Sequence, residues 1–263
     1  MMQDTLDMLK DMRMSAMRAE LERQENDPVL CRELSAEERI SLLVCAEWNR
    51  KQSNRVRRLI TNACFPLSSA TMEGVEYFED RHLDRAKLVK LSACGYIAKG
   101  RHIILKGAAG AGKTYLACAL GTAACRCFKK VLFIRMPELL DSLRIARNSG
   151  DLQKLLKGYR KADLLIIDEW LIRKLTPEES YDLLEIMESR CGKEQSRSMI
   201  LCTQYDTEEW YERISPNQDG ESTISDAILD RIIHNAHDIL LEGAASMRER
   251  HGLKAALEAG EED

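Results

Sequence analysis

The chain has 263 residues, of which 44% are hydrophobic and 31% are charged, and its formal net charge is −4. This composition is that of an ordinary globular protein, and no apolar run approaches the roughly 18 residues that a membrane helix needs, so we expect no contact with a membrane. The start, MMQDTLD, lacks the basic and then apolar layout of a signal peptide, and nine scattered cysteines without metal-ligand spacing indicate a reducing compartment, so we expect a cytoplasmic protein.

The first part of the chain is predicted to be helical. Apolar residues recur at three- and four-residue spacing from Leu6 to Ala19, which predicts one helix. A second helix is expected to begin at the capping-box pattern from Ser35 to Glu38 and to run to about Ala63. The stretch 65–76, which contains Pro, Ser and Gly, then predicts a boundary, so we expect a small helical domain over residues 1–70.

A cluster of cations without an acid lies in the second predicted helix, in the stretch RKQSNRVRR. Such a patch can bind a phosphate backbone although the whole chain is acidic, because screening over about 8 Å makes the local charge decisive. A solvated helix face, balanced by neighbouring acids, explains the same pattern equally well on charge alone. The candidate DNA-binding residues in this cluster are Arg50, Lys51, Arg55, Arg57 and Arg58.

From about residue 102, short apolar runs alternate with longer helical stretches. The runs are HIILK at 102–106, VLFIR at 131–135, LLIID at 164–168, SMILC at 198–202 and DILLE at 238–242. Runs this apolar, separated by helix-length segments, are typical of a parallel sheet that is covered on both faces. The sequence therefore predicts an α/β domain with a five-stranded parallel sheet over residues 71–252, followed by an acidic tail, 253–263, that we expect to be flexible.

The octet GAAGAGKT lies between the first apolar run and a helix-forming segment, which is the context of a phosphate loop of the form G-x-x-x-x-G-K-[ST]. Its glycines let backbone N–H groups turn toward the phosphates of ATP. Lys113 is expected to neutralise charge on the β- and γ-phosphates, and Thr114 to bind Mg²⁺. A chance glycine-rich turn does not explain the full motif in this context. The candidate ATP-binding residues are Gly107, Ala108, Ala109, Gly110, Ala111, Gly112, Lys113, Thr114 and Tyr115.

Asp168 and Glu169 end the third apolar run, at the sheet edge where ligands gather in open α/β folds. Asp168 is expected to hold Mg²⁺ through its water shell, and Glu169 to polarise the water that attacks the γ-phosphate. A small-molecule kinase with a phosphate loop has no need of such a glutamate. The pair therefore favours ATP hydrolysis over transfer of phosphate to a metabolite.

Three further residues are candidates for sensing the nucleotide. Thr203 and Gln204 end the fourth run, and either side chain can hydrogen-bond the γ-phosphate or the attacking water. Arg231 lies in a predicted helix that starts near residue 226, from which a cation can reach the γ-phosphate of a neighbouring subunit as an arginine finger. The alternative for Arg231 is an ion pair with Asp230 or another surface acid.

Several segments together resemble the IstB-type transposition helper ATPases, which belong to the AAA+ class and are close relatives of the DnaC helicase loader. The segments are GAAGAGKTYLA, LLIIDEW, SMILCTQY, ISDAILDRIIHNAHDILLEG and SMRER. The front half, LSAEERISLLVCAEWNRKQSNRVRRLITNACFP, is similar to the N-terminal helical domain of that family. The resemblance covers about residues 5 to 252, and it implies an AAA+ core preceded by a helical domain that contacts DNA, other copies or a partner.

The resemblance also implies a function. Such proteins use ATP to oligomerise on double-stranded DNA, deform it, and recruit and stimulate a partner transposase encoded beside them in an insertion sequence. It assigns the octet to Walker A, Asp168 and Glu169 to Walker B, Gln204 to a sensor and Arg231 to the arginine finger in trans. Arg248 matches a second sensor, although the stretch 242–246 is longer here than the Glu-Gly-Glu-Ser that is usual in the family.

A second basic segment, 143–163, falls where AAA+ rings commonly face bound nucleic acid. Its candidate DNA-binding residues are Lys154, Lys157, Arg160 and Lys161. No base-reading module is evident in the sequence, so we expect mostly sequence-tolerant contacts with the DNA backbone. The rival interpretation is a DnaC-like loader, which has the same core but acts on single-stranded DNA and binds a replicative helicase.

Overall fold

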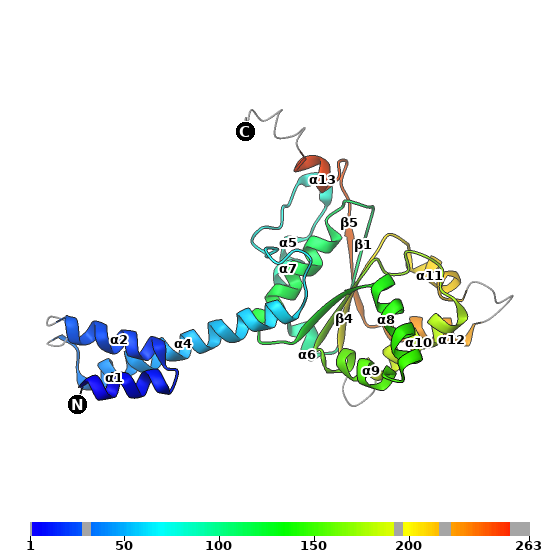
Figure 1. Cartoon of the computed structure of the whole chain (residues 1–263). Helices are drawn as coiled ribbons and strands as arrows, with labels where there is room; N and C mark the ends of the chain where they lie inside the picture. Colours follow the sequence, from blue (N-terminus) through cyan, green and yellow to red (C-terminus); the bar gives the residue numbers. More distant parts are fainter. Residues whose placement is uncertain (1, 28–32, 192–196, 216–221, 253–263) are drawn as a thin grey trace. The chain divides into compact units, whose positions relative to one another are not determined.

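The structure is a computed structural model that describes residues 2–27, 33–191, 197–215 and 222–252 (Figure 1). The chain divides into two compact units, Met1–Arg58 and Leu59–Asp263. The predicted acidic tail, 253–263, lies outside the described residues.

The first unit is helical, as the sequence predicts. The single helix expected between Leu6 and Ala19 is instead two helices, α1 (Met2–Asp11) and α2 (Ser15–Asn26). Arg13 adopts the left-handed conformation, with φ 58°, and turns the chain between them. Helical periodicity in the sequence continues across this turn, which is why the periodicity alone does not reveal it.

The long helix α4 (Ala36–Asn62) begins at the predicted capping box. The backbone N–H of Glu38 donates to Ser35 Oγ at 3.2 Å, and the backbone N–H of Ser35 donates to the Glu38 carboxylate at 2.8 Å. Further along α4, the buried carboxylate of Glu47 accepts the backbone N–H of Ala16 at 3.1 Å. The start of α2 is therefore bonded to the middle of α4.

The two units divide inside α4, at Arg58, whereas the sequence places the boundary near residue 70. Packing explains the earlier division, because Leu59 and Phe65 contact the core of the second unit, and Ala63 and Ala70 are fully buried in it. The backbone N–H of Phe133 also donates to the Ala63 carbonyl at 2.9 Å. The stretch 59–70 therefore belongs, by its contacts, with the second unit.

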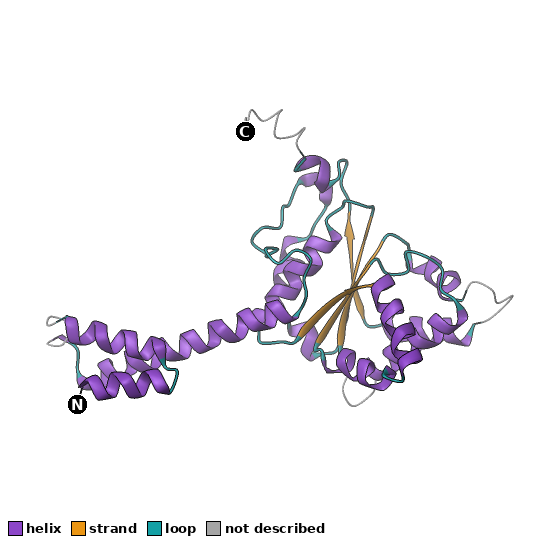
Figure 2. Cartoon of the chain, viewed as in Figure 1, coloured by secondary structure: helices purple, strands orange, loops and turns teal. Residues whose placement is uncertain are grey.

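The second unit contains a five-stranded parallel sheet with the strand order β2-β3-β4-β1-β5 (Figure 2). The predicted α/β fold with a five-stranded parallel sheet is confirmed. The last strand begins two residues earlier than the predicted 238, because Ala236 still pairs with His102 at the start of the first strand. The strands are β1 (His102–Gly107), β2 (Val131–Arg135), β3 (Leu164–Asp168), β4 (Ser198–Thr203) and β5 (Ala236–Leu241).

Helices cover both faces of this sheet (Figures 1 and 2). Alternate residues of the strands serve two apolar cores, with Ile103 and Leu105 in one and Ile104 in the other. The first core includes residues of α5 (Arg85–Ser92), α6 (Gly95–Ala98) and α7 (Lys113–Arg126). The second includes residues of α8 (Met136–Ser149), α9 (Leu152–Lys161), α10 (Pro177–Arg190), α11 (Thr207–Ile214) and α12 (Thr223–Ile233).

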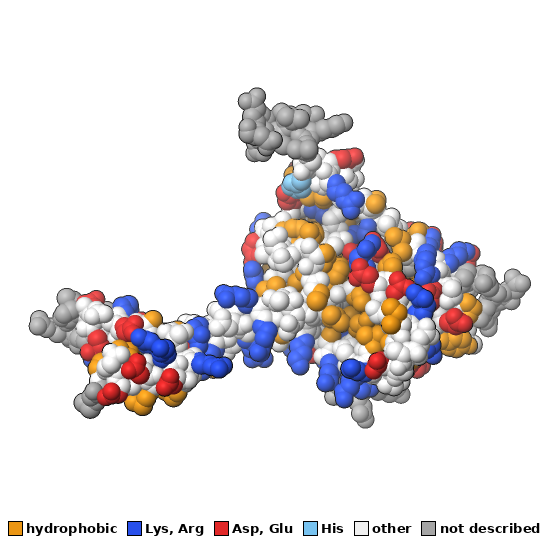
Figure 3. Space-filling model, in the orientation of Figure 1, with side chains coloured by type: hydrophobic (Ala, Val, Ile, Leu, Met, Phe, Trp, Pro, Cys, Tyr) orange, Lys and Arg blue, Asp and Glu red, His pale blue; other side chains and the backbone are white. Residues whose placement is uncertain are grey.

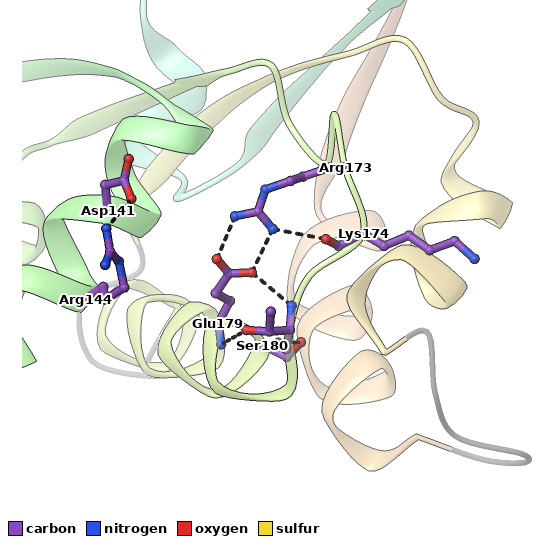
Figure 4. Close-up of polar contacts among 7 residues, drawn as sticks. Asp141, Arg144, Arg173, Lys174, Glu179 and Ser180 are labelled. Atoms are coloured by element: carbon purple, nitrogen blue, oxygen red, sulfur yellow. Dashed lines mark hydrogen bonds and ion pairs between the residues drawn. The ribbon is translucent and has the colours of Figure 1, made fainter.

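Polar contacts fix the segment that leaves β3 (Figure 4). The carboxylate of Glu179 accepts hydrogen bonds from Arg173 at 2.6 and 2.9 Å and from the backbone N–H of Thr176 at 2.9 Å. Thr176 in turn caps α10 through the backbone N–H of Glu179. The loop after Asp168 therefore ends at a well-bonded helix start, which limits how far it can move.

Candidate functional site

The glycine-rich octet forms a tight loop between β1 and α7. Gly110 and Gly112 adopt φ values of 80° and 90°, a region that residues with a Cβ rarely occupy. A Cβ on Gly107 would lie 2.3 Å from the backbone oxygen of Leu241, so only glycine fits beside β5. The glycines of the motif thus allow the backbone to curl at the N-terminus of α7, where N–H groups are available to bind phosphate.

The side chain of Lys113 is hydrogen-bonded to the backbone at the start of this loop. Its side-chain ammonium donates to the backbone carbonyls of Gly107 and Ala108, at 2.7 Å each, and the residue is only 9% exposed. Burial lowers the pKa of Lys113. A lysine has three N–H donors, so one remains for a phosphate oxygen after these two bonds.

Thr114, which ends the phosphate-loop motif, lies beside Asp168, which ends β3. The Thr114 hydroxyl donates to Asp168 Oδ2 at 2.8 Å, and the backbone N–H of Glu169 donates to Asp168 Oδ1 at 2.9 Å. Asp168 is buried at the carboxyl end of β3. The two oxygen-bearing side chains that the sequence predicts as magnesium ligands therefore lie next to one another.

Glu169 does not point freely into this site. It has φ 56°, and its two carboxylate oxygens accept hydrogen bonds from Arg135 at 2.6 and 2.7 Å. These bonds raise the pKa of Arg135. The contact of Arg135 with Glu169 was not predicted from the sequence. The position of Arg135 was the available signal for it, because Arg135 ends β2 and pairs in register with Asp168 on the adjacent strand.

The two sensor candidates differ in their surroundings. Thr203 is buried, donates to the backbone carbonyl of Trp170 at 3.2 Å and accepts the backbone N–H of Tyr205 at 3.1 Å. Gln204 is exposed, and its side chain has no hydrogen-bond partner among residues 2–27, 33–191, 197–215 and 222–252. Thr203 therefore ties the end of β4 to the segment after Glu169, while the amide of Gln204 stays available.

Arg231 lies near the amino ends of the strands, whereas the phosphate loop lies at their carboxyl ends. It is in the last turn of α12, which leads into Ala236 and the start of β5, whereas Gly107 pairs with the end of β5 at Leu241. Its guanidinium pairs with Glu188 at 3.3 Å and donates to the Ala227 carbonyl. Arg231 therefore cannot serve the phosphate loop of its own chain, and a surface acid holds it in the isolated chain.

The segment after β5 packs on the phosphate loop and ends in the short helix α13 (Met247–Arg250). The backbone N–H of Met247 donates to the Gly110 carbonyl at 2.9 Å. Arg248 is exposed, whereas Arg250 pairs with Asp80 and stacks on the Phe78 ring, 4.3 Å from its centroid. Of the two arginines, Arg250 is thus the one with an anchoring role, and Arg248 is left facing solvent.

Two cavities flank the loop. One of about 460 Å³ lies between residues 107–109 and the segment 240–247, and another of about 280 Å³ is lined by Val75, Tyr115, Leu116 and Met247. Arg81 lines both cavities, although it is only 5% exposed. Both cavities adjoin the phosphate loop.

Arg81 is a site residue that was not predicted from the sequence. Its guanidinium donates to the backbone carbonyls of Glu76 at 2.6 Å and of Ala111, inside the phosphate loop, at 3.0 Å. Burial lowers the pKa of Arg81. The residue thus fixes the loop from the segment before β1, and no spacing rule in the sequence indicates this contact.

The two predicted basic surfaces are not equivalent. In α4, Arg50 is bonded to Glu47 at 2.7 Å and to the Arg13 carbonyl at 2.6 Å, and Lys51 lies 3.9 Å from Glu47. Arg55, Arg57 and Arg58 are exposed. In α9 all four candidates are exposed, and within the described part of the chain none has an ion-pair partner: Lys154, Lys157, Arg160 and Lys161.

Two classes of feature are missing from the described residues. No group of three or more His, Cys, Asp or Glu side chains there is arranged to hold a metal ion. No described helix is long and apolar enough to cross a membrane.

Comparison with known proteins assigns the chain to a family. Residues 7–255 match the model of the IstB-like ATP binding proteins. An insertion-sequence ATP-binding protein of Sinorhizobium fredii is 37% identical over 216 residues, 82% of this chain and 84% of that protein. The ATP-binding protein of insertion sequence IS1162 from Pseudomonas fluorescens is 36% identical over 204 residues, 78% of this chain and 87% of that protein.

Solved structures share the fold at low sequence identity. DnaI aligns with a TM-score of 0.56 and 19% identity over 73% of this chain and 100% of that chain. AMPPCP-bound DnaA from Aquifex aeolicus aligns with a TM-score of 0.54 and 17% identity over 72% of this chain and 55% of that chain. The fold is that of the AAA+ P-loop proteins, and the chain belongs to the IstB-like ATP-binding protein family.

Proposed function

We propose that this protein is a Mg²⁺-dependent ATPase that assembles on double-stranded DNA in its ATP-bound form, helps to select target DNA, and stimulates the transposase of an insertion sequence. The observation that carries the proposal is the contact between Thr114 and Asp168, at 2.8 Å, with Glu169 next in the chain. This places the end of the phosphate loop against a strand-end carboxylate pair, as ATP hydrolysis requires.

The residues present fit a magnesium ion. Mg²⁺ prefers oxygen ligands and few protein side chains, and the Thr114 hydroxyl and Asp168 carboxylate are adjacent oxygen donors beside the phosphate loop. Thr114 and Asp168 would hold the ion, which when bound would neutralise charge on the β- and γ-phosphate oxygens.

We assign the hydrolysis step to Lys113 and Glu169, which lie beside Thr114 and Asp168. The remaining N–H of Lys113 donates to the phosphate, and Glu169 accepts a proton from the water whose oxygen attacks the γ-phosphorus. The bond from that phosphorus to the β–γ bridging oxygen breaks, which gives ADP and inorganic phosphate. Both oxygens of Glu169 are bonded to Arg135, so this arginine competes with the attacking water for the carboxylate.

The position of Arg231 supports assembly as a condition for hydrolysis. Because Arg231 lies at the far sheet edge, it can reach only the γ-phosphate of another subunit, and it must leave Glu188 to do so. A cation supplied between subunits makes the ATPase rate depend on oligomerisation.

The outer face of α9 supports contact with a DNA backbone (Figure 3). Lys and Arg side chains gather near this helix, and none of its four cations has an ion-pair partner within the described chain. Gly158 lies among them in the interior of α9, and apart from its chain neighbours and the backbone of its own helix no atom lies within 4 Å of the place of a Cβ. A glycine destabilises a helix by about 1 kcal/mol relative to alanine. Its missing side chain would let the backbone of α9 approach a ligand closely.

The relatives support the choice of DNA and partner. Those named above are ATP-binding proteins of insertion sequences. We therefore assign duplex DNA and the transposase of the same element as partners.

The test is the ATPase rate of the full chain alone, with duplex DNA and with single-stranded DNA, alongside particle size with a non-hydrolysable ATP analogue. Stimulation by duplex together with analogue-dependent assembly is expected. Stimulation by single strands alone would favour a helicase loader, and a rate that ignores both forms of DNA would contradict the proposed role. Lys113→Ala, run in parallel, gives the background rate from contaminating ATPases.

A further inference from the structure

Two segments that are far apart in the sequence lie side by side at the phosphate loop (Figure 1). They are residues 76–81, which precede α5, and residues 244–251, which follow β5, and we call them the flanking segments. Asp80 joins them, because its Oδ2 accepts the backbone N–H of Ala244 at 2.8 Å and pairs with the guanidinium of Arg250. The side chains of this ion pair are only 32% and 23% exposed, so water shields their attraction incompletely.

Each flanking segment holds one carbonyl of the phosphate loop. From the segment after β5, the backbone N–H of Met247 donates to the Gly110 carbonyl at 2.9 Å. From the segment before α5, Arg81 Nη2 donates to the Ala111 carbonyl at 3.0 Å. The packing is close, since a Cβ on Gly110 would lie 2.7 Å from the Cβ of Ser246. The loop is therefore supported at two successive residues by two segments that are bonded to one another.

The bond from Arg81 sets the direction of a backbone donor. In a trans peptide unit the C=O and the N–H point in opposite directions, and the carbonyl of Ala111 shares its unit with the N–H of Gly112. Holding this carbonyl on Arg81 therefore turns the Gly112 N–H away from Arg81. Gly112 is the residue directly before α7, where N–H groups at the helix start bind phosphate.

Arg81 is suited to this positioning role by its own contacts. Its Nη1 donates to the Glu76 carbonyl at 2.6 Å while its Nη2 donates to Ala111, and the residue is buried. Both Nη atoms are thus bonded to the backbone of this chain, which makes Arg81 a positioning residue and not a catalytic one. The planar guanidinium meets two carbonyls at once, which the single ammonium of a lysine does not reproduce with the same geometry.

We propose that Arg81 positions the phosphate loop for the phosphates of the nucleotide, and that the Asp80–Arg250 ion pair keeps Arg81 in place by tying the flanking segments together. This inference rests on the ATP binding proposed above, and it adds residues outside the phosphate-loop motif that hold the loop in its binding conformation. Because the effect is exerted through the loop backbone, it concerns the phosphates and not the base or the sugar.

Isothermal titration calorimetry of the full chain with ADP and with pyrophosphate, both in the presence of Mg²⁺, tests the proposal. Arg81→Met should weaken the binding of both ligands by about tenfold, because a charged hydrogen bond to the loop is lost. Arg81→Lys keeps the charge but not the fork of donors, and it should also weaken both ligands. Pyrophosphate has no base or sugar, so an equal loss for the two ligands places the effect at the phosphate loop.

A second variant leaves the buried Arg81 intact. Arg250→Gln removes the ion pair that joins the flanking segments and should weaken ADP and pyrophosphate by a few-fold each. Arg197→Gln is the matched control, because Arg197 pairs with Asp163 at 2.7 Å with side-chain exposures of 26% and 32%, and Asp163 likewise accepts a backbone N–H, from Lys130 at 2.8 Å. That pair lies at the amino ends of β3 and β4, so the control should bind both ligands normally. Circular dichroism and thermal unfolding establish that each variant is folded.

Three results would overturn this inference and leave the proposed function standing. Normal affinity in Arg81→Lys would mean that only the charge matters, and a loss for ADP without a loss for pyrophosphate would place the effect of Arg81 on another part of the nucleotide. Equal effects of Arg250→Gln and Arg197→Gln would remove the ion pair from the account. A wild-type chain that binds neither ligand would overturn both this inference and the proposed function.

Discussion

The phosphate loop and the outer face of α9 are both suited to phosphate, but they are built in opposite ways. Lys113 is buried and bonded to two loop carbonyls, and Thr114 is bonded to Asp168, so the loop is organised before ATP arrives. Lys154 and Lys157 on α9 are exposed and have no described ion-pair partner.

This difference predicts how each surface responds to change. A buried, pre-bonded site holds one arrangement of phosphates, and a single substitution leaves other groups unpaired. A row of exposed cations acts additively and through released counterions, so each residue contributes little and the sum depends on salt.

Glu169→Gln should give the largest effect. It keeps the shape of the side chain but removes the proton acceptor, so ATP turnover should fall by about 10²–10⁴-fold while ATP affinity is retained. Single-turnover hydrolysis and equilibrium binding of a fluorescent ATP analogue measure the two quantities. Rapid turnover in this variant would remove Glu169 from the mechanism.

Lys113→Ala should weaken ATP binding by about a hundredfold, because a charged hydrogen bond to phosphate contributes up to roughly 3 kcal/mol. The substitution also leaves the Gly107 and Ala108 carbonyls without their donor. Lys99→Ala, at an exposed lysine of the same unit, is the control and should bind ATP normally. Tight ATP binding by Lys113→Ala would show that the loop is not the phosphate site.

The double variant Lys154→Gln/Lys157→Gln should reduce the salt dependence of duplex binding. Removing two phosphate contacts should lower the slope of log K against log salt by about 2, with little change in ATP affinity. The control is Arg144→Gln, because Arg144 is already paired with Asp141 at 3.1 Å. An unchanged slope would make α9 a solvated face.

Arg135→Ala should raise the ATPase rate without DNA by a few-fold. The pair of Arg135 with Glu169 is partly exposed, so it is a weak restraint, and its removal frees the proposed base. Initial rates at saturating ATP measure this effect, with Arg144→Gln again as the control. A rate that falls to the level of Glu169→Gln would mean that Arg135 instead holds Glu169 in its working position.

The sequence predicted those features that depend on local pattern. The sheet, the phosphate loop and the strand-end pair Asp168–Glu169 each follow from periodicity or fixed spacing, and parallel topology brings strand ends to one edge. The contact of Thr114 with Asp168 is a consequence of that topology.

Features that depend on packing between distant segments were not predictable in this way. Arg81 reaches the loop at Ala111 from thirty residues before it, and Arg135 meets Glu169 only because β2 and β3 are neighbours. The availability of cations also required the structure, because α4 and α9 are similarly basic in sequence, yet Arg50 is bonded to Glu47.

Duplex affinity in two nucleotide states tests the central claim, that ATP on the phosphate loop controls DNA binding by the assembled protein. The binding of one duplex is measured at fixed salt with a non-hydrolysable ATP analogue and with ADP. Tight, cooperative binding with the analogue and much weaker binding with ADP is the predicted result. Equal affinity in the two states would contradict the account.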